Sequence, residues 1–144
     1  YYSNEVMNEQ AAALGVAVRK AIEDSGKRVV LVASHSLSHR HFVTEAPLPE
    51  DMSREHIYNH SQYVWDMKVI EMMREGKMKE VIDLLPEMIE QTMAEAEGGG
   101  LTWMMAAMSM PDYPAEIYGY QSVIGTGNVI AAWDPNSATR EIVL

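Results

Sequence analysis

The chain has 144 residues, a formal net charge of −10 and no cysteine, and this length is enough for one domain with a buried core. Its acidic balance disfavours nucleic acid and anionic membranes as partners, since both repel negative charge, and the lack of cysteine excludes disulfides and thiolate metal ligands within it. No apolar run approaches the ~20 residues that span a bilayer and no signal peptide is visible, so we expect a cytoplasmic protein.

The first predicted element is an amphipathic helix that begins after Ser3, a residue suited to capping. Apolar residues recur along it with a period near 3.6, and Gly26 suits the left-handed position that ends a helix. The chain starts with Tyr1 and lacks an initiator methionine. We therefore expect it to be cut from a longer protein, with residues 1–144 forming one domain or half-domain.

A short apolar run, Val-Val-Leu-Val-Ala at 29–33, predicts a buried strand of an α/β sheet. It passes directly into a segment with three histidines, His35, His39 and His41. Open α/β sheets bind ligands beyond the carboxyl ends of their strands, and imidazole is well suited to proton transfer near neutral pH. His39 is therefore a candidate catalytic residue, with a surface-loop histidine as the alternative. We interpret His35 and His41 as structural residues.

The middle of the chain is predicted to be helical after an irregular Pro-rich segment at 45–51. The expected helices run from a Ser53 cap to Gly76, over 79–85, from Pro86 to about Ala96, and over the apolar stretch 101–110.

The end of the chain predicts two strands, 118–124 and 129–133, around a Gly-rich turn. Residues 140–144 fit either a last strand or a frayed end. Together these elements predict an α/β fold with a central mixed sheet flanked by helices.

Two acidic residues, Glu95 and Glu97, end a predicted helix just before three glycines at 98–100. A carboxylate there opposes the helix dipole, which hints at a role such as metal ligation, with a solvated helix end as the alternative. His56 and His60 have the spacing of helical zinc sites. Because the glutamate of a metalloprotease helix is absent, we favour an exposed polar face for them.

Several motifs together resemble one family. Ser36-Leu37-Ser38-His39 follows a predicted buried strand, Tyr63-Val64-Trp65-Asp66 leads a helix, a glutamate lies upstream of the apolar 101–108 helix, and the chain closes with Tyr-Gln-Ser-Val-Ile-Gly-Thr-Gly-Asn-Val-Ile-Ala-Ala-Trp. In order and spacing these motifs resemble the class III extradiol ring-cleavage dioxygenases of the protocatechuate 4,5-dioxygenase type. The resemblance spans essentially the whole chain.

The resemblance implies a role in the catabolism of aromatic compounds. Enzymes of this type hold a non-haem Fe(II) with two histidines and one carboxylate and use O₂ to open the ring of 2-aminophenol or a related catechol. On this chain His39 matches the acid/base histidine. Glu95 matches the carboxylate ligand of the iron, with Glu97 as the alternative.

The chain departs from the family pattern in one respect, because nothing in it matches the two iron histidines. The resemblance places those in the N-terminal half of a longer chain. We therefore expect this chain to be the C-terminal half of a larger single domain, inactive alone, with a related alpha subunit or a second copy as partner. A catalytically inactive subunit of the same fold, or an α/β interaction module, is the alternative.

Overall fold

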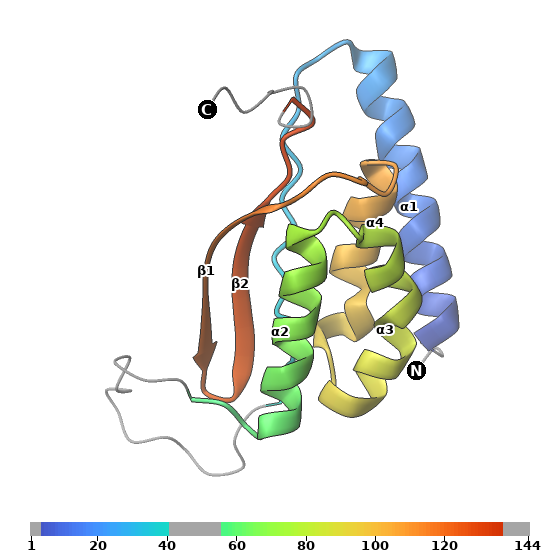
Figure 1. Cartoon of the computed structure of the whole chain (residues 1–144). Helices are drawn as coiled ribbons and strands as arrows, with labels where there is room; N and C mark the ends of the chain where they lie inside the picture. Colours follow the sequence, from blue (N-terminus) through green and yellow to red (C-terminus); the bar gives the residue numbers. More distant parts are fainter. Residues whose placement is uncertain (1–3, 41–55, 137–144) are drawn as a thin grey trace, which may run out of the picture.

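The computed structural model describes residues 4–40 and 56–136. Its elements in chain order are α1 (Asn4–Ser25), α2 (His60–Arg74), α3 (Met78–Thr92), the 3₁₀ turn η1 (Glu95–Gly98), α4 (Gly99–Ala107), β1 (Glu116–Val123) and β2 (Thr126–Ala132). Figure 1 shows the hairpin on one side and the helices packed beside it. The α/β class predicted from the sequence is confirmed. Across the described ranges, no helix is both long and apolar enough to cross a membrane.

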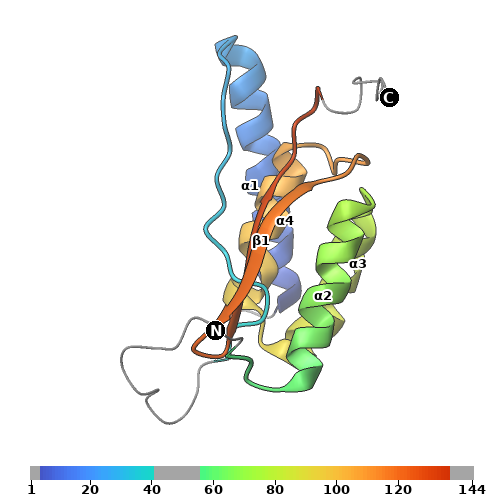
Figure 2. The ribbon, with the colours of Figure 1, turned by 60° about the vertical axis from the view of Figure 1, so that its left-hand side comes forward.

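Helix α1 packs against α4 with its backbone unusually close. A Cβ atom at Gly15 would lie 2.6 Å from Ala106 Cβ and 2.9 Å from the Ala107 nitrogen, so glycine is the residue that allows this approach. Helix α4 is apolar around most of its circumference and buries Leu101 and Met105, as its sequence predicts. The pair forms the back layer of the molecule, behind the hairpin in the view of Figure 2.

The hairpin pairs β1 and β2 antiparallel, from Glu116 opposite Ala132 to Val123 opposite Thr126. Its turn consists of Ile124 and Gly125, both with positive φ, so Thr126 to Asn128 belong to β2 and not to the turn predicted at 125–128. Helix α2 contacts both strands of the hairpin, and α3 packs against α2. The buried core includes Leu37, Val69, Ile70, Met73, Met78, Val81, Leu85, Met88, Leu101 and Met105.

The prediction of a buried strand at 29–33 is wrong in one respect. The segment is extended but belongs to neither strand of the described sheet, and Val30 and Val32 are 86% and 78% exposed. Exposure still alternates along it, because Leu31 and Ala33 are partly covered. The segment therefore has one partly covered face, as a strand would. Among residues 4–40 and 56–136, no strand lies next to it to cover its other face.

The start of helix α2 also differs from the sequence prediction. Helix α2 begins at His60, because the Asn59 side chain accepts a hydrogen bond from the Gln62 N–H and caps it. His56 lies before this helix, in a bridge to the hairpin turn, so His56 and His60 do not share a helix face. The cap proposed at Ser53, the capping Ser3, His41, the Pro-rich segment and residues 140–144 lie outside the described residues.

Helix α3 is one continuous helix with Pro86 inside it, and not two helices meeting at that proline. A proline in a helix interior costs about 3 kcal/mol. The helix buries Val81, Leu85, Met88 and Ile89, and burial of each such side chain contributes roughly 1.5–3 kcal/mol. Burial therefore outweighs the lost hydrogen bond.

The α1–α4 contact predicts an unusual effect of a glycine substitution. Alanine normally stabilises a helix relative to glycine, but Gly15→Ala should lower the free energy of unfolding by about 1–3 kcal/mol because of overpacking. Gly99→Ala is the matched control, since the nearest atom to its added Cβ is 4.0 Å away, and it should be neutral or stabilising by less than about 1 kcal/mol. Urea denaturation measures both, and an equally stable Gly15→Ala protein would contradict the described helix contact.

Candidate functional site

The candidate site is built on the turn Ser36–His39, which we call the histidine turn. Two main-chain hydrogen bonds join it to the start of β2, from the Leu37 N–H to the Gly127 carbonyl (2.8 Å) and from the Gly127 N–H to the Ser38 carbonyl (2.9 Å). The Ser36 hydroxyl donates to the Asn128 side-chain oxygen at 2.8 Å. The hairpin thus holds the histidine turn from one side.

The segment that follows α3 holds the histidine turn from the other side. The Glu95 carboxylate accepts a short hydrogen bond from the Ser36 N–H. The Glu95 N–H donates to the Leu37 carbonyl, and the His39 N–H donates to the Thr92 carbonyl, both at 3.4 Å. Glu95 and His39, which the sequence analysis singled out separately, are therefore brought to one place.

The electrostatics of the site favour an ionised carboxylate beside imidazole groups. The Ser36 N–H, and more weakly the nearby His39 and His35, hold the pKa of Glu95 below its usual value. Burial lowers the pKa of His35, and the His39 ring lowers it further, while the Glu95 charge acts in the opposite direction. At neutral pH the site thus presents a carboxylate and a neutral His35 imidazole.

The backbone around Glu95 takes up conformations that non-glycine residues rarely adopt. Ala96 and Glu97 have φ values of 44° and 52°, each of which costs about 1–2 kcal/mol. Asn8 of α1 helps to hold this stretch, since its side-chain nitrogen donates to the Glu97 carbonyl at 3.1 Å and its oxygen accepts from the Thr102 hydroxyl at 2.7 Å. Of the two candidate carboxylates, Glu95 is the one bonded to the histidine turn.

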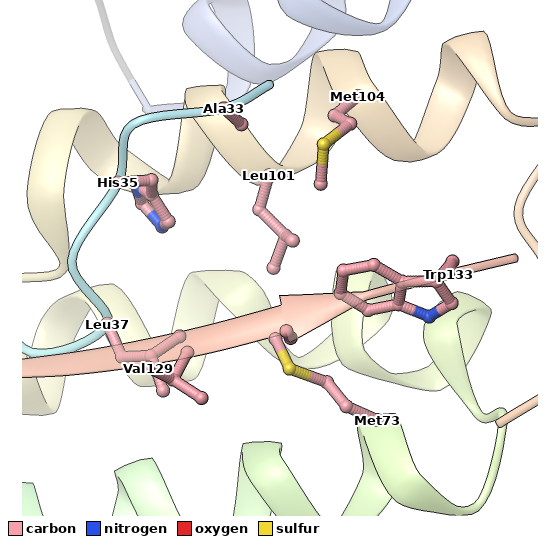
Figure 3. A pocket seen from close by; sticks show the side chains of 9 residues that line it. Ala33, His35, Leu37, Met73, Leu101, Met104, Val129 and Trp133 are labelled. Atoms are coloured by element: carbon pink, nitrogen blue, oxygen red, sulfur yellow. The ribbon is translucent and has the colours of Figure 1, made fainter. Parts of the chain in front are cut away.

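A cavity of about 60 Å³ adjoins the histidine turn, beneath α4 and beside β2. Figure 3 shows the His35 ring at one end and the Trp133 indole at the other, with Leu101 and Met104 above and Met73 below. The lining is otherwise apolar. His35 lines this cavity and is close enough to Glu95 for that carboxylate to influence its pKa.

The described residues do not bring together a full set of metal ligands. Across residues 4–40 and 56–136, no group of three or more His, Cys, Asp or Glu side chains gathers closely enough to hold a metal ion. An ionised carboxylate such as that of Glu95 is a ligand type that suits a divalent cation.

Sequence reasoning missed one residue of this region, Asp66, which is completely buried beneath the histidine turn. A signal was present, since Asp66 lies one turn before the buried Val69 and Ile70 on the face of α2 that packs into the core.

Two comparisons with known proteins identify the family. The model described as "catalytic LigB subunit of aromatic ring-opening dioxygenase" matches residues 4–132. The chain belongs to this family. It is also 52% identical over 134 residues to the 2-aminophenol 1,6-dioxygenase beta subunit of a Pseudomonas species, a match that covers 93% of this chain and 44% of that protein. The chain therefore spans less than half the length of this LigB relative.

The match to the LigB family includes the histidine turn and the segments that hold it. His39, Glu95, the histidine turn and both strands of the hairpin lie within residues 4–132. The resemblance found from the sequence motifs is thus confirmed at the level of the family, whereas the roles of His39 and Glu95 stay predictions.

Burial of His35 predicts a pH dependence of stability. Its pKa is lower in the folded chain than the ordinary 6.5, so the unfolded chain binds more protons below that pH, and the free energy of unfolding falls as the solution is acidified through 6.5. His35→Gln should make this fall shallower, whereas His60→Gln, at an exposed position, should leave it unchanged. Urea denaturation above and below pH 6.5 compares them, and parallel curves for His35→Gln and wild type would refute the argument.

Proposed function

We propose that this chain is part of a non-haem Fe(II)-dependent extradiol dioxygenase that opens the ring of 2-aminophenol or a related catechol with O₂. The observation that carries the proposal is the hydrogen bond between the Glu95 carboxylate and the turn that bears His39. This bond brings a side chain of a metal-ligand type, the carboxylate, next to a segment with a side chain of an acid/base type, the imidazole. The membership of the LigB family and the similarity to a 2-aminophenol 1,6-dioxygenase subunit support the reaction class.

Each of the two residues has a separate role in this proposal. Glu95 supplies one anionic oxygen ligand, and its lowered pKa keeps that oxygen free of a proton at neutral pH. His39 accepts or donates a proton at the substrate, which general acid–base catalysis requires. The iron, when bound, lets electron density pass from the chelated substrate to O₂. Glu97 is the alternative ligand.

The remaining two ligands, both histidines, are proposed to come from a polypeptide that corresponds to the part of the Pseudomonas relative not covered here. The open face of the 29–33 segment supports this. Together with the β2 end of the hairpin it borders a largely apolar hollow of about 760 Å³, and it exposes Val30 and Val32. An unpaired extended segment with apolar side chains is suited to pairing with further strands. We propose that the 144 residues are the half-domain that such strands complete.

A related alpha subunit or a second copy of the chain is a further proposed partner, since the Pseudomonas relative is called a beta subunit. A catalytically inactive subunit of the same fold is the second candidate function. The hydrogen bond of the Glu95 carboxylate to the histidine turn favours the enzyme over an inactive subunit, because a subunit without chemistry has no need of a carboxylate there.

The first test asks whether the chain needs the missing polypeptide. The chain should bind no stoichiometric Fe(II) and consume no O₂ with 2-aminophenol when assayed alone. Co-expressed with the uncovered part of the Pseudomonas relative, it should gain both properties. Iron analysis and an oxygen electrode measure them, and turnover by the chain alone would contradict the proposed division of ligands.

The second test separates the two residues in the assembled protein. His39→Ala should keep the iron but lower kcat by roughly 10²–10⁴-fold, the usual effect of removing a general acid–base. Glu95→Ala should lose iron, and Glu97→Ala is its matched control with iron retained. Wild-type turnover by His39→Ala would remove His39 from the mechanism, and iron loss in Glu97→Ala alone would make Glu97 the ligand.

A further inference from the structure

Asp66 is a buried acid whose position the proposed mechanism does not use. It lies on α2 with 0% of its surface exposed. Its carboxylate oxygens accept hydrogen bonds from the Ser38 N–H (2.9 Å), the Ser38 hydroxyl (2.7 Å) and the Tyr120 hydroxyl (2.8 Å). These donors are all neutral, and burial raises the pKa of Asp66 in spite of them.

A buried carboxylate with only neutral partners is costly, so its presence calls for an explanation. A residue that served packing alone could be replaced by an apolar side chain of similar volume, often without loss of stability. The three hydrogen bonds instead link α2, the histidine turn and β1 through one side chain. Two of them end on Ser38, the residue next to His39 in the chain.

The backbone of β2 is shaped around this carboxylate. A Cβ atom at Gly127 would overlap Asp66, at 2.7 Å from its Cγ, and would lie 2.8 Å from the Ser38 hydroxyl. Gly127 is the residue whose N–H and carbonyl both bond to the histidine turn. The glycine thus allows the carboxylate to lie between β2 and α2, directly under that turn.

We propose that Asp66 is a positioning residue that fixes the histidine turn, and thereby the relative placement of His39 and Glu95. Its hydrogen bonds orient Ser38, the main-chain bonds to Gly127 fix the turn against β2, and Ser36 then presents its N–H to the Glu95 carboxylate. The meaning of this placement for catalysis rests on the proposed function, whereas the placement itself does not.

The test uses two variants that differ in hydrogen bonding at one site. Asp66→Ala removes all three acceptors. Asp66→Asn keeps the shape, and its amide can still accept from the Ser38 N–H and donate to the two hydroxyl oxygens. The matched control is Asp83→Asn, an exposed acid on α3 that pairs with Lys79.

Amide hydrogen exchange of the chain alone gives the first readout. In Asp66→Ala the Ser36 and Leu37 amides should lose protection while the amides of α1 and α4 keep theirs. Asp66→Asn and Asp83→Asn should resemble wild type. A uniform loss of protection in Asp66→Ala would show a purely structural role, and an Asp66→Asn chain that behaves like Asp66→Ala would show that charge, and not hydrogen-bond geometry, matters. Either result would overturn the proposal.

Kinetics of the assembled protein give the second readout. Asp66→Ala should lower kcat roughly 10–100-fold, as expected when a supporting residue shifts a reacting group, with a smaller change in KM. Asp66→Asn should restore most of the rate, and an unchanged kcat in Asp66→Ala would overturn the positioning role. If no assembled protein shows ring cleavage while the exchange pattern appears as described, the proposed function fails and the placement by Asp66 stands.

A milder variant covers the case in which Asp66→Ala does not fold. Tyr120→Phe removes one of the three donors from a partly exposed side chain, so the fold should survive. It should reduce protection of the Ser36 and Leu37 amides in the same direction but by less. Unchanged protection at both amides would overturn the proposal.

Discussion

The pair of main-chain hydrogen bonds between Leu37–Ser38 and Gly127 is the contact on which the candidate site depends. It joins segments that lie far apart in the sequence and closes the histidine turn against the hairpin. Without it, the backbone of Ser36 and Ser38 would not be held where it can donate hydrogen bonds to Glu95 and Asp66. The site is therefore a tertiary construction, in which each proposed side chain is placed by a different element.

The surroundings of the histidine turn are polar in an otherwise apolar core. The Thr92 carbonyl accepts from the Gln62 side chain at 2.8 Å as well as from the His39 N–H, and Gln62 and Thr92 are both buried. Buried polar groups are retained where their hydrogen bonds fix one arrangement. The cavity on the far side of the turn is lined, apart from His35, by apolar side chains, with Leu37 and Trp133 among them. The turn thus lies between a buried polar network and an apolar cavity.

Much of this arrangement could be predicted from the sequence, because local patterns determine it. The amphipathic period of the first residues predicted α1, and Gly26 predicted where it ends. The apolar composition of 101–110 predicted a buried helix. The family followed from motifs in the correct order. The continuity of α3 through Pro86 could not be predicted, since tertiary burial outweighs the local preference of proline. The start of α2 at His60 was open to prediction, because Asn59 is a preferred capping residue and its bond to Gln62 is local.

The candidate residues divide in the same way. His39 and Glu95 could be chosen by residue type and resemblance, but their meeting through Ser36 is a long-range contact that no local pattern reports. Asp66 was missed because a single acid in an amphipathic helix is usually exposed, although its place on the face of α2 that carries Val69 and Ile70 was a signal of burial. The 29–33 run has the composition of a buried strand, yet burial is a property of its neighbours, and among the described residues those do not include a strand on its open face.

Asn8 links the site to α1, a helix that supplies no proposed catalytic or metal-binding residue. Through its bonds to the Glu97 carbonyl and the Thr102 hydroxyl, α1 holds the strained link that carries Glu95, while Gly15 sets how deeply α1 lies on α4. Substitutions on α1 would therefore shift the Glu95 carboxylate although no residue of α1 needs to contact that side chain.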